Sequence, residues 1–141
     1  MRIATALGFS GKVEYRHVYS QTGGAQYGRG TNHEADVLTV YAEAFDRDAD
    51  PEDFSLEAMI AHERGHQLLA WHPRIAKRVA GLSEASEEIL ASLLGAMICN
   101  DAIDTATLYA KAAAQLLDVG HSVEAVNRQL QDLQNILEAL L

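Results

Sequence analysis

The sequence His62-Glu63-Arg64-Gly65-His66 lies in an apolar run that suits a helix, flanked by Leu56, Met59, Ile60, Leu68 and Leu69. At 3.6 residues per turn, the two histidines are one turn apart on the same helical face. Two imidazoles at this spacing can bind one Zn²⁺ from the same side. Glu63 lies beside them, where it can take a proton from a zinc-activated water instead of binding the metal. The pattern therefore indicates a zinc-dependent hydrolase, and a peptidase before other classes.

A zinc hydrolase needs a third protein ligand, because its zinc takes three protein ligands and a water. Glu88 is the first candidate, since the helical face that it begins continues with small residues only, Ala91, Ser92 and Gly95. Small side chains let a second helix come close, which a carboxylate needs if it is to reach a metal on that helix. The other faces of this segment are apolar, so we expect Glu88 to lie in a central, buried helix, where an unpaired carboxylate is costly.

His72 is the second candidate for the third ligand, with the spacing HExxHxxxxxH. Such a site needs the helix to break after the second histidine, commonly at a glycine, so that the third histidine can swing back. Leu69 occupies that position here and favours continued helix, and Pro73 breaks the chain too late. We therefore favour His62, His66 and Glu88 as metal ligands, with His72 as the alternative.

The composition favours one compact domain, residues 1–141, in which 48% of the residues are apolar. The net charge of −9 disfavours broad binding to nucleic acid, which needs Lys and Arg to neutralise phosphates. We expect no membrane span, because no apolar run is long enough. We also expect a cytoplasmic protein: the apolar stretch Ile3–Phe9 is too short for a secretory signal, and the single Cys99, interpreted as a core residue, suits a reducing compartment.

The order of elements predicts an α+β fold, with a sheet of about three strands followed by four helices. Alternating residues predict strands, and the Gly-rich segment between them predicts a turn (strands 12–20 and 36–42, turn 21–32). Asp50-Pro51-Glu52-Asp53 is typical of a helix start, so the motif helix should begin between Asp50 and Ser55 and end near Trp71-His72. Further helices are expected at 83–100, 104–119 and 122–141. The basic cluster Arg74, Lys77 and Arg78 is interpreted as a solvated loop or helix end.

The motif followed some twenty residues later by Glu-x-x-Ala-Ser resembles the gluzincin clan of zinc metallopeptidases, over about residues 55–98. The small size is closer to the ImmA/IrrE-type proteases than to thermolysin, although the Ala-Asn-x-Phe-Ala run of the former is absent. The resemblance implies a zincin-like fold, Zn²⁺ as cofactor, a peptide or protein substrate, His62, His66 and Glu88 as ligands, and Glu63 as catalytic base. Asp36–Ala42 is similar to the edge strand that pairs with an extended substrate in that clan.

Two features depart from the clan. Thermolysin-like chains carry an Asp four residues after the ligand Glu, where it orients a ligand histidine, and here the position is Ser92. The downstream histidine that stabilises the oxyanion has no clear match, so the candidates for that role are Tyr41, His72, Arg74, Tyr109 and His121.

Alternatives remain at the level of function and assembly. A site built from His62, His66 and His72 resembles the bacterial ribosomal-RNA-processing metallohydrolases, although the acidic charge and Glu63 argue against it. A zincin-fold binding module without catalysis is a further alternative. At the C-terminus, apolar residues recur at spacings of three and four: Val123, Val126, Leu130, Leu133, Leu137 and Leu140. They either pack onto the chain's own core or form the seam of a homodimer.

Overall fold

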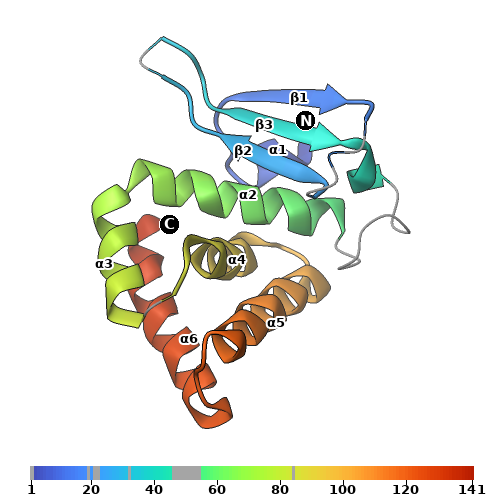
Figure 1. Ribbon diagram of the computed structural model, residues 1–141. Helices are drawn as coiled ribbons and strands as arrows, with labels where there is room; N and C mark the ends of the chain where they lie inside the picture. Colours follow the sequence, from blue (N-terminus) through green and yellow to red (C-terminus); the bar gives the residue numbers. More distant parts are fainter. Residues whose placement is uncertain (1, 19, 21–22, 32, 46–54, 84) are drawn as a thin grey trace.

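The computed structural model describes residues 2–18, 20, 23–31, 33–45, 55–83 and 85–141 (Figure 1). A three-stranded sheet forms from β1 (Lys12–Arg16), β2 (Ala25–Gly28) and β3 (Val37–Tyr41). It lies on one side of α2 (Leu56–Trp71), and the later helices lie on the other side of α2 (Figure 1). The expected α+β fold, with an N-terminal sheet followed by helices, is confirmed.

The strand order β1-β3-β2 puts β3 in the centre of the sheet. β3 pairs in parallel with β1 and antiparallel with β2, so both of its edges are taken. The strand expected at Asp36–Ala42 therefore exists, but the prediction that it is an exposed edge is wrong. The reason is β2, which lies within the segment interpreted as a Gly-rich turn and pairs with β3 from Ala25 to Gly28. β1 also ends at Arg16, earlier than the expected Ser20.

Glycines on either side of the short strand β2 let the chain approach its neighbours closely. A Cβ atom at Gly24, just before β2, would overlap the Met59 sulfur of α2, and one at Gly30, just after β2, would overlap the backbone of Glu34 and Ala35. Glycine is required at such close approaches. The glycine content of this segment suggested a turn. In the structure, the glycines lie at the two ends of a strand, where the chain approaches α2 and the residues before β3.

One apolar core lies between the sheet and α2. It combines the inward face of β3, Leu38 and Val40, with Ala58 and Ile60 of α2, all fully buried. A short helix that the sequence analysis did not expect, α1 (Arg2–Ala6), closes this core with Ala4 and the following Leu7 and Phe9. The sheet is thereby held on the face of α2 that carries Ile60.

A second core joins α2 to the remaining helices: α3 (Pro73–Ser83), α4 (Glu87–Ile98), α5 (Ala102–Asp118) and α6 (Val123–Leu137), followed by the short 3₁₀ turn η3 (Glu138–Leu140). Within the described residues, five main helices thus follow the sheet, instead of the expected four. The extra one is α3, which contains the basic cluster interpreted as a loop or helix end. Pro73 ends α2 as expected, but it also serves as the first residue of α3, a position that its fixed φ favours.

The helix boundaries follow capping side chains. Ser55 caps α2 by accepting a hydrogen bond from the Ala58 N–H, while the expected start signal at Asp50–Asp53 lies outside the described residues. Ser86 caps α4, three residues after position 83, where this helix was expected to begin. Ser122 caps α6 as expected.

The C-terminal repeat packs inside the chain. Val126, Leu130, Leu133, Leu137 and Leu140 are buried in the second core, and only Val123 of the series is exposed, at 72%. The internal-core alternative accounts for this repeat, so these side chains are not free to form a dimer seam. In the described part of the chain, no helix is both long and apolar enough to cross a membrane.

The helices α2 and α4 pack with their backbones in contact. A Cβ atom at Gly65 of α2 would overlap the Ala91 carbonyl of α4. A Cβ atom at Gly95 of α4 would lie 3.0 Å from the backbone nitrogen of His62 in α2. The small face that the sequence analysis found on α4 therefore meets the motif helix, as expected. Gly65, inside the motif itself, is the complementary small residue on α2.

We predict that Gly65→Ala lowers the free energy of unfolding by about 1–3 kcal/mol, because the added methyl forces α2 and α4 apart. This loss should appear even though alanine gains about 1 kcal/mol of helix propensity over glycine. The matched control is Gly81→Ala in α3, where an added Cβ meets nothing within 4 Å and should stabilise the protein by about 0.5–1 kcal/mol. Urea unfolding of both variants measures the difference, and a stabilised Gly65→Ala protein would contradict the close packing.

Candidate metal centre

The motif histidines project from one face of α2 toward α4. Their rings are 4.8 Å apart between centroids and nearly perpendicular, and their Nε2 atoms lie 3.1 Å apart. His62 is buried and His66 is partly buried. The i, i+4 spacing on a continuous helix is sufficient to bring the two nitrogens together.

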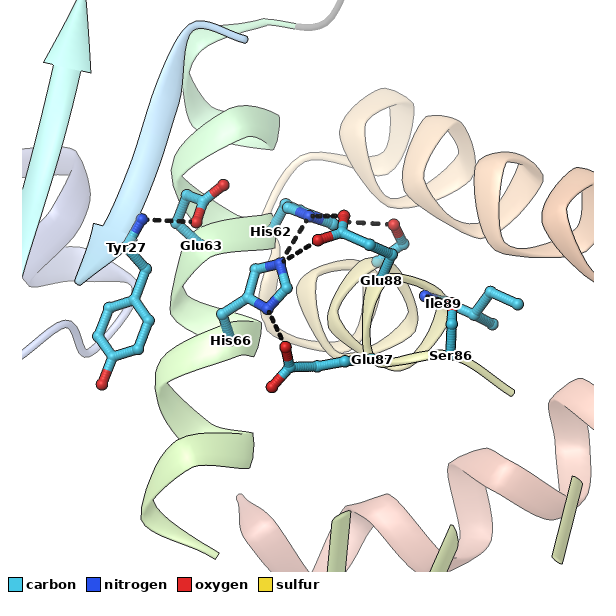
Figure 2. A network of polar contacts seen from close by, with 9 residues as sticks. Tyr27, His62, Glu63, His66, Ser86, Glu87, Glu88 and Ile89 are labelled. Atoms are coloured by element: carbon cyan, nitrogen blue, oxygen red, sulfur yellow. Dashed lines mark hydrogen bonds and ion pairs between the residues drawn. The ribbon is translucent and has the colours of Figure 1, made fainter. Parts of the chain in front are cut away.

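Glu88 meets the two histidines from the first turn of α4 (Figure 2). One of its oxygens lies 3.0 Å from His62 Nε2, and the other lies 3.0 Å from His66 Nε2. Ligand atoms of the three side chains all lie within 4.8 Å of one another, so the group could hold a metal ion. It is the only such group of three or more His, Cys, Asp or Glu in the part of the chain that the structure describes.

Glu88 belongs to a buried helix, as expected, but its side chain is not enclosed there. Its side chain is 57% exposed, whereas α4 is buried continuously from Ile89 to Ala96. The difference arises because α4 begins at Glu87, so Glu88 is at the end of the helix that meets solvent. Hydrogen bonds from His62 and His66 hold the pKa of Glu88 well below its usual value.

Each histidine has a partner on its second ring nitrogen. His62 Nδ1 lies 3.1 Å from the hydroxyl of the fully buried Ser92, and His66 Nδ1 lies 3.5 Å from a carboxylate oxygen of Glu87. The Ser92 contact occupies the position where thermolysin-like chains carry an aspartate. A partner on Nδ1 fixes the ring and directs Nε2 toward Glu88.

Glu63 points to a different side of α2 from the two histidines. Its carboxylate accepts a hydrogen bond from the backbone N–H of Tyr27 in β2, at 2.8 Å (Figure 2). Burial raises the pKa of Glu63, and the nearby His62, His66 and Tyr27 N–H oppose that rise. Glu63 therefore adjoins the three-residue group without being part of it.

The Tyr27 N–H is available to Glu63 because of the pairing of β2. The Tyr41 N–H donates to the Gly24 carbonyl, at 2.9 Å, and hydrogen-bonded pairs alternate along an antiparallel ladder. Gln26 and Gly28 consequently direct their backbone groups toward β3, whereas Ala25 and Tyr27 direct theirs to the free edge. That free edge is the one that lies next to α2 and Glu63.

His72 and the other oxyanion candidates are not part of this group. His72 Nδ1 is 2.9 Å from the Leu68 carbonyl at the end of α2, so the structure does not bring His72 to the other two histidines. Tyr41 donates its hydroxyl to Gln26, and Arg74 is exposed on α3. Neither these residues nor Tyr109 and His121 form a hydrogen bond or ion pair with His62, His66 or Glu88.

Asp36, just before β3, accepts hydrogen bonds from both β2 and α2. Its carboxylate accepts hydrogen bonds from the Tyr27 hydroxyl at 2.8 Å, Gln67 Nε2 at 2.9 Å, Trp71 Nε1 at 2.8 Å and the Gly30 N–H at 2.7 Å. Burial alone would raise the pKa of Asp36, but these four donors lower it to about 2. Sequence reasoning missed this residue, because two of its donors lie on α2, more than thirty residues further along the chain.

Comparison with protein-family models, curated proteins and solved structures finds no match for this chain.

We predict that Asp36→Asn lowers the free energy of unfolding by about 1–2 kcal/mol at pH 7, because the amide cannot accept from four donors. Since the folded-state pKa is below the ordinary value of 3.8, the stabilisation is present above about pH 4 and is lost as the pH falls toward 2. Urea unfolding at pH 7 and at pH 3 should show a smaller difference between the parent and the variant at the lower pH. Asp132→Asn, an exposed change on α6, is the control and should alter stability little at either pH; a constant difference between parent and Asp36→Asn would contradict the assignment.

Proposed function

We propose that the protein is a zinc-dependent metallopeptidase, with His62, His66 and Glu88 as metal ligands and Glu63 as general base. The observation that carries the proposal is the convergence of two imidazole Nε2 atoms and one carboxylate from two helices, within 4.8 Å. A second carboxylate, Glu63, lies one residue from a proposed ligand and outside the group. This division of two carboxylates between binding and proton transfer is what a zinc hydrolase needs.

The chemistry of the donor set fits zinc. Two imidazole nitrogens and one carboxylate oxygen are a ligand set of catalytic zinc sites, which keep a further position for water or substrate. The contacts of Ser92 and Glu87 with the two Nδ1 atoms fit the supporting interactions that histidine ligands have in such sites. The exposure of Glu88 fits a site that substrate can reach.

Zinc bound at this position would supply a Lewis acid that polarises a peptide carbonyl and makes a water molecule more acidic. Glu63 would take the proton from the attacking water and deliver it to the leaving amine. His62 and His66, held through Ser92 and Glu87, would keep their Nε2 atoms in place during these transfers.

A peptide substrate is favoured by the free edge of β2. The backbone groups of Ala25 and the Tyr27 carbonyl face away from β3, and an extended peptide could pair with them as an added strand. The Tyr27 N–H is not among these groups, because it donates to Glu63. In this proposal β2 would pair with the substrate, the role expected of Asp36–Ala42. The net charge of −9 and the separation of His72 from His62 and His66 disfavour the RNA-processing alternative.

We predict that the protein binds about one Zn²⁺ per chain and that Glu88→Ala sharply lowers its zinc affinity, because one of three ligands is lost. His72→Ala is the matched control and should bind zinc as the parent does. Titration of metal-free protein with Zn²⁺, followed by metal analysis, measures both. Loss of zinc binding in His72→Ala with retention in Glu88→Ala would reverse the ligand assignment and favour the three-histidine site.

We predict that Glu63→Gln retains fold and zinc affinity but cleaves peptides ~10²–10⁴-fold more slowly than the parent, because glutamine keeps the shape of the side chain without its basicity. Cleavage of a mixed peptide library, scored by mass spectrometry, gives the rates. A variant that cleaves as fast as the parent would refute Glu63 as the base. A zinc-loaded parent without any cleavage would instead favour the binding-module alternative.

A further inference from the structure

One contact links the sheet directly to the proposed general base. The Tyr27 N–H donates to one carboxylate oxygen of Glu63 at 2.8 Å, across 36 residues of sequence. Within the described residues, no other group donates a hydrogen bond to Glu63. Figure 2 shows the second oxygen of this carboxylate pointing away from Tyr27.

The donor is itself held rigidly. The Tyr27 hydroxyl donates to Asp36, and the Tyr27 ring contacts the Phe9 ring edge-on, with centroids 6.4 Å apart. The pairing of β2 with β3 fixes the direction of the Tyr27 N–H toward the free edge. A donor fixed by its side chain and by its strand can orient a flexible carboxylate that rotates about three bonds.

We propose that the Tyr27 backbone N–H is a positioning group for Glu63: it holds one carboxylate oxygen and leaves the other as the oxygen that accepts the proton. The role in catalysis rests on the peptidase function proposed above. The contact also brings the free edge of β2 into the proposed reaction site, because the register of β2 fixes the position of the Glu63 carboxylate. The Tyr27 N–H is then not free for a peptide strand, which would pair through Ala25 and the Tyr27 carbonyl.

The contact is tested without metal or activity by hydrogen exchange. In metal-free protein, Glu63→Ala should increase the exchange rate of the Tyr27 amide by about tenfold or more, because an edge-strand N–H without a partner is open to water. The Gln26 amide, which faces β3, is the internal control and should be unchanged. Equal exchange of the Tyr27 amide in parent and variant would overturn the proposal.

The role in catalysis is tested by removing the N–H. Tyr27→Pro lacks the donor, and proline is tolerated on an edge strand where its N–H would face outward. Tyr27→Ala loses the same side chain but keeps the N–H, so it is the matched control. Tyr27→Pro should bind Zn²⁺ as Tyr27→Ala does and show an unchanged KM, with kcat about ten- to a hundredfold lower than that of Tyr27→Ala.

The outcomes separate the two proposals. Equal kcat in folded Tyr27→Pro and Tyr27→Ala would overturn the positioning role and leave the peptidase proposal intact. A parent that binds zinc but cleaves nothing would overturn the peptidase proposal, and the exchange measurement would still decide whether Tyr27 holds Glu63. If Tyr27→Pro does not fold, the exchange measurement alone decides.

Discussion

The backbone contact between α2 and α4 is the constraint on which the rest of the molecule depends. Gly65 faces the Ala91 carbonyl, and Gly95 faces the backbone at His62, so each helix supplies one glycine to the other. At this separation the Glu88 carboxylate reaches the Nε2 atoms of both histidines, and the Ser92 hydroxyl reaches Nδ1 of His62. Larger residues at these two points would increase the helix separation and take the carboxylate away from the imidazoles.

Different faces of α2 contact the sheet and the layer of later helices. One face carries His62 and His66 toward α4, and another carries Glu63 and Gln67 toward the sheet. The carboxylate that joins the histidines and the carboxylate that stays outside their group are thereby separated by the geometry of a single helix. Each is fixed by a different layer, Glu88 by the helical layer and Glu63 by the edge of β2.

The attachment of the sheet to α2 is polar as well as apolar. Leu38 and Val40 pack on α2 from the centre of the sheet, while Asp36 joins Tyr27 of β2 to Gln67 and Trp71 of α2. A carboxylate with four donors is a strong local constraint, because breaking it would leave charged and polar groups unpaired. The position of β2 over Glu63, which the proposed chemistry needs, depends on this carboxylate.

The sequence by itself determined the α+β class, the helix Leu56–Trp71 and the residues of the candidate centre. These follow from local rules: the 3.6-residue period brings His62 and His66 together, and the small face after Glu88 allows a close helix contact. The tertiary structure alone decided that β3 is central, that Glu88 is at an exposed helix end, and that the Tyr27 N–H meets Glu63. Strand order, the Tyr27–Glu63 contact and the hydrogen bonds that Asp36 accepts from Gln67 and Trp71 join residues far apart in the chain, so no local pattern could specify them.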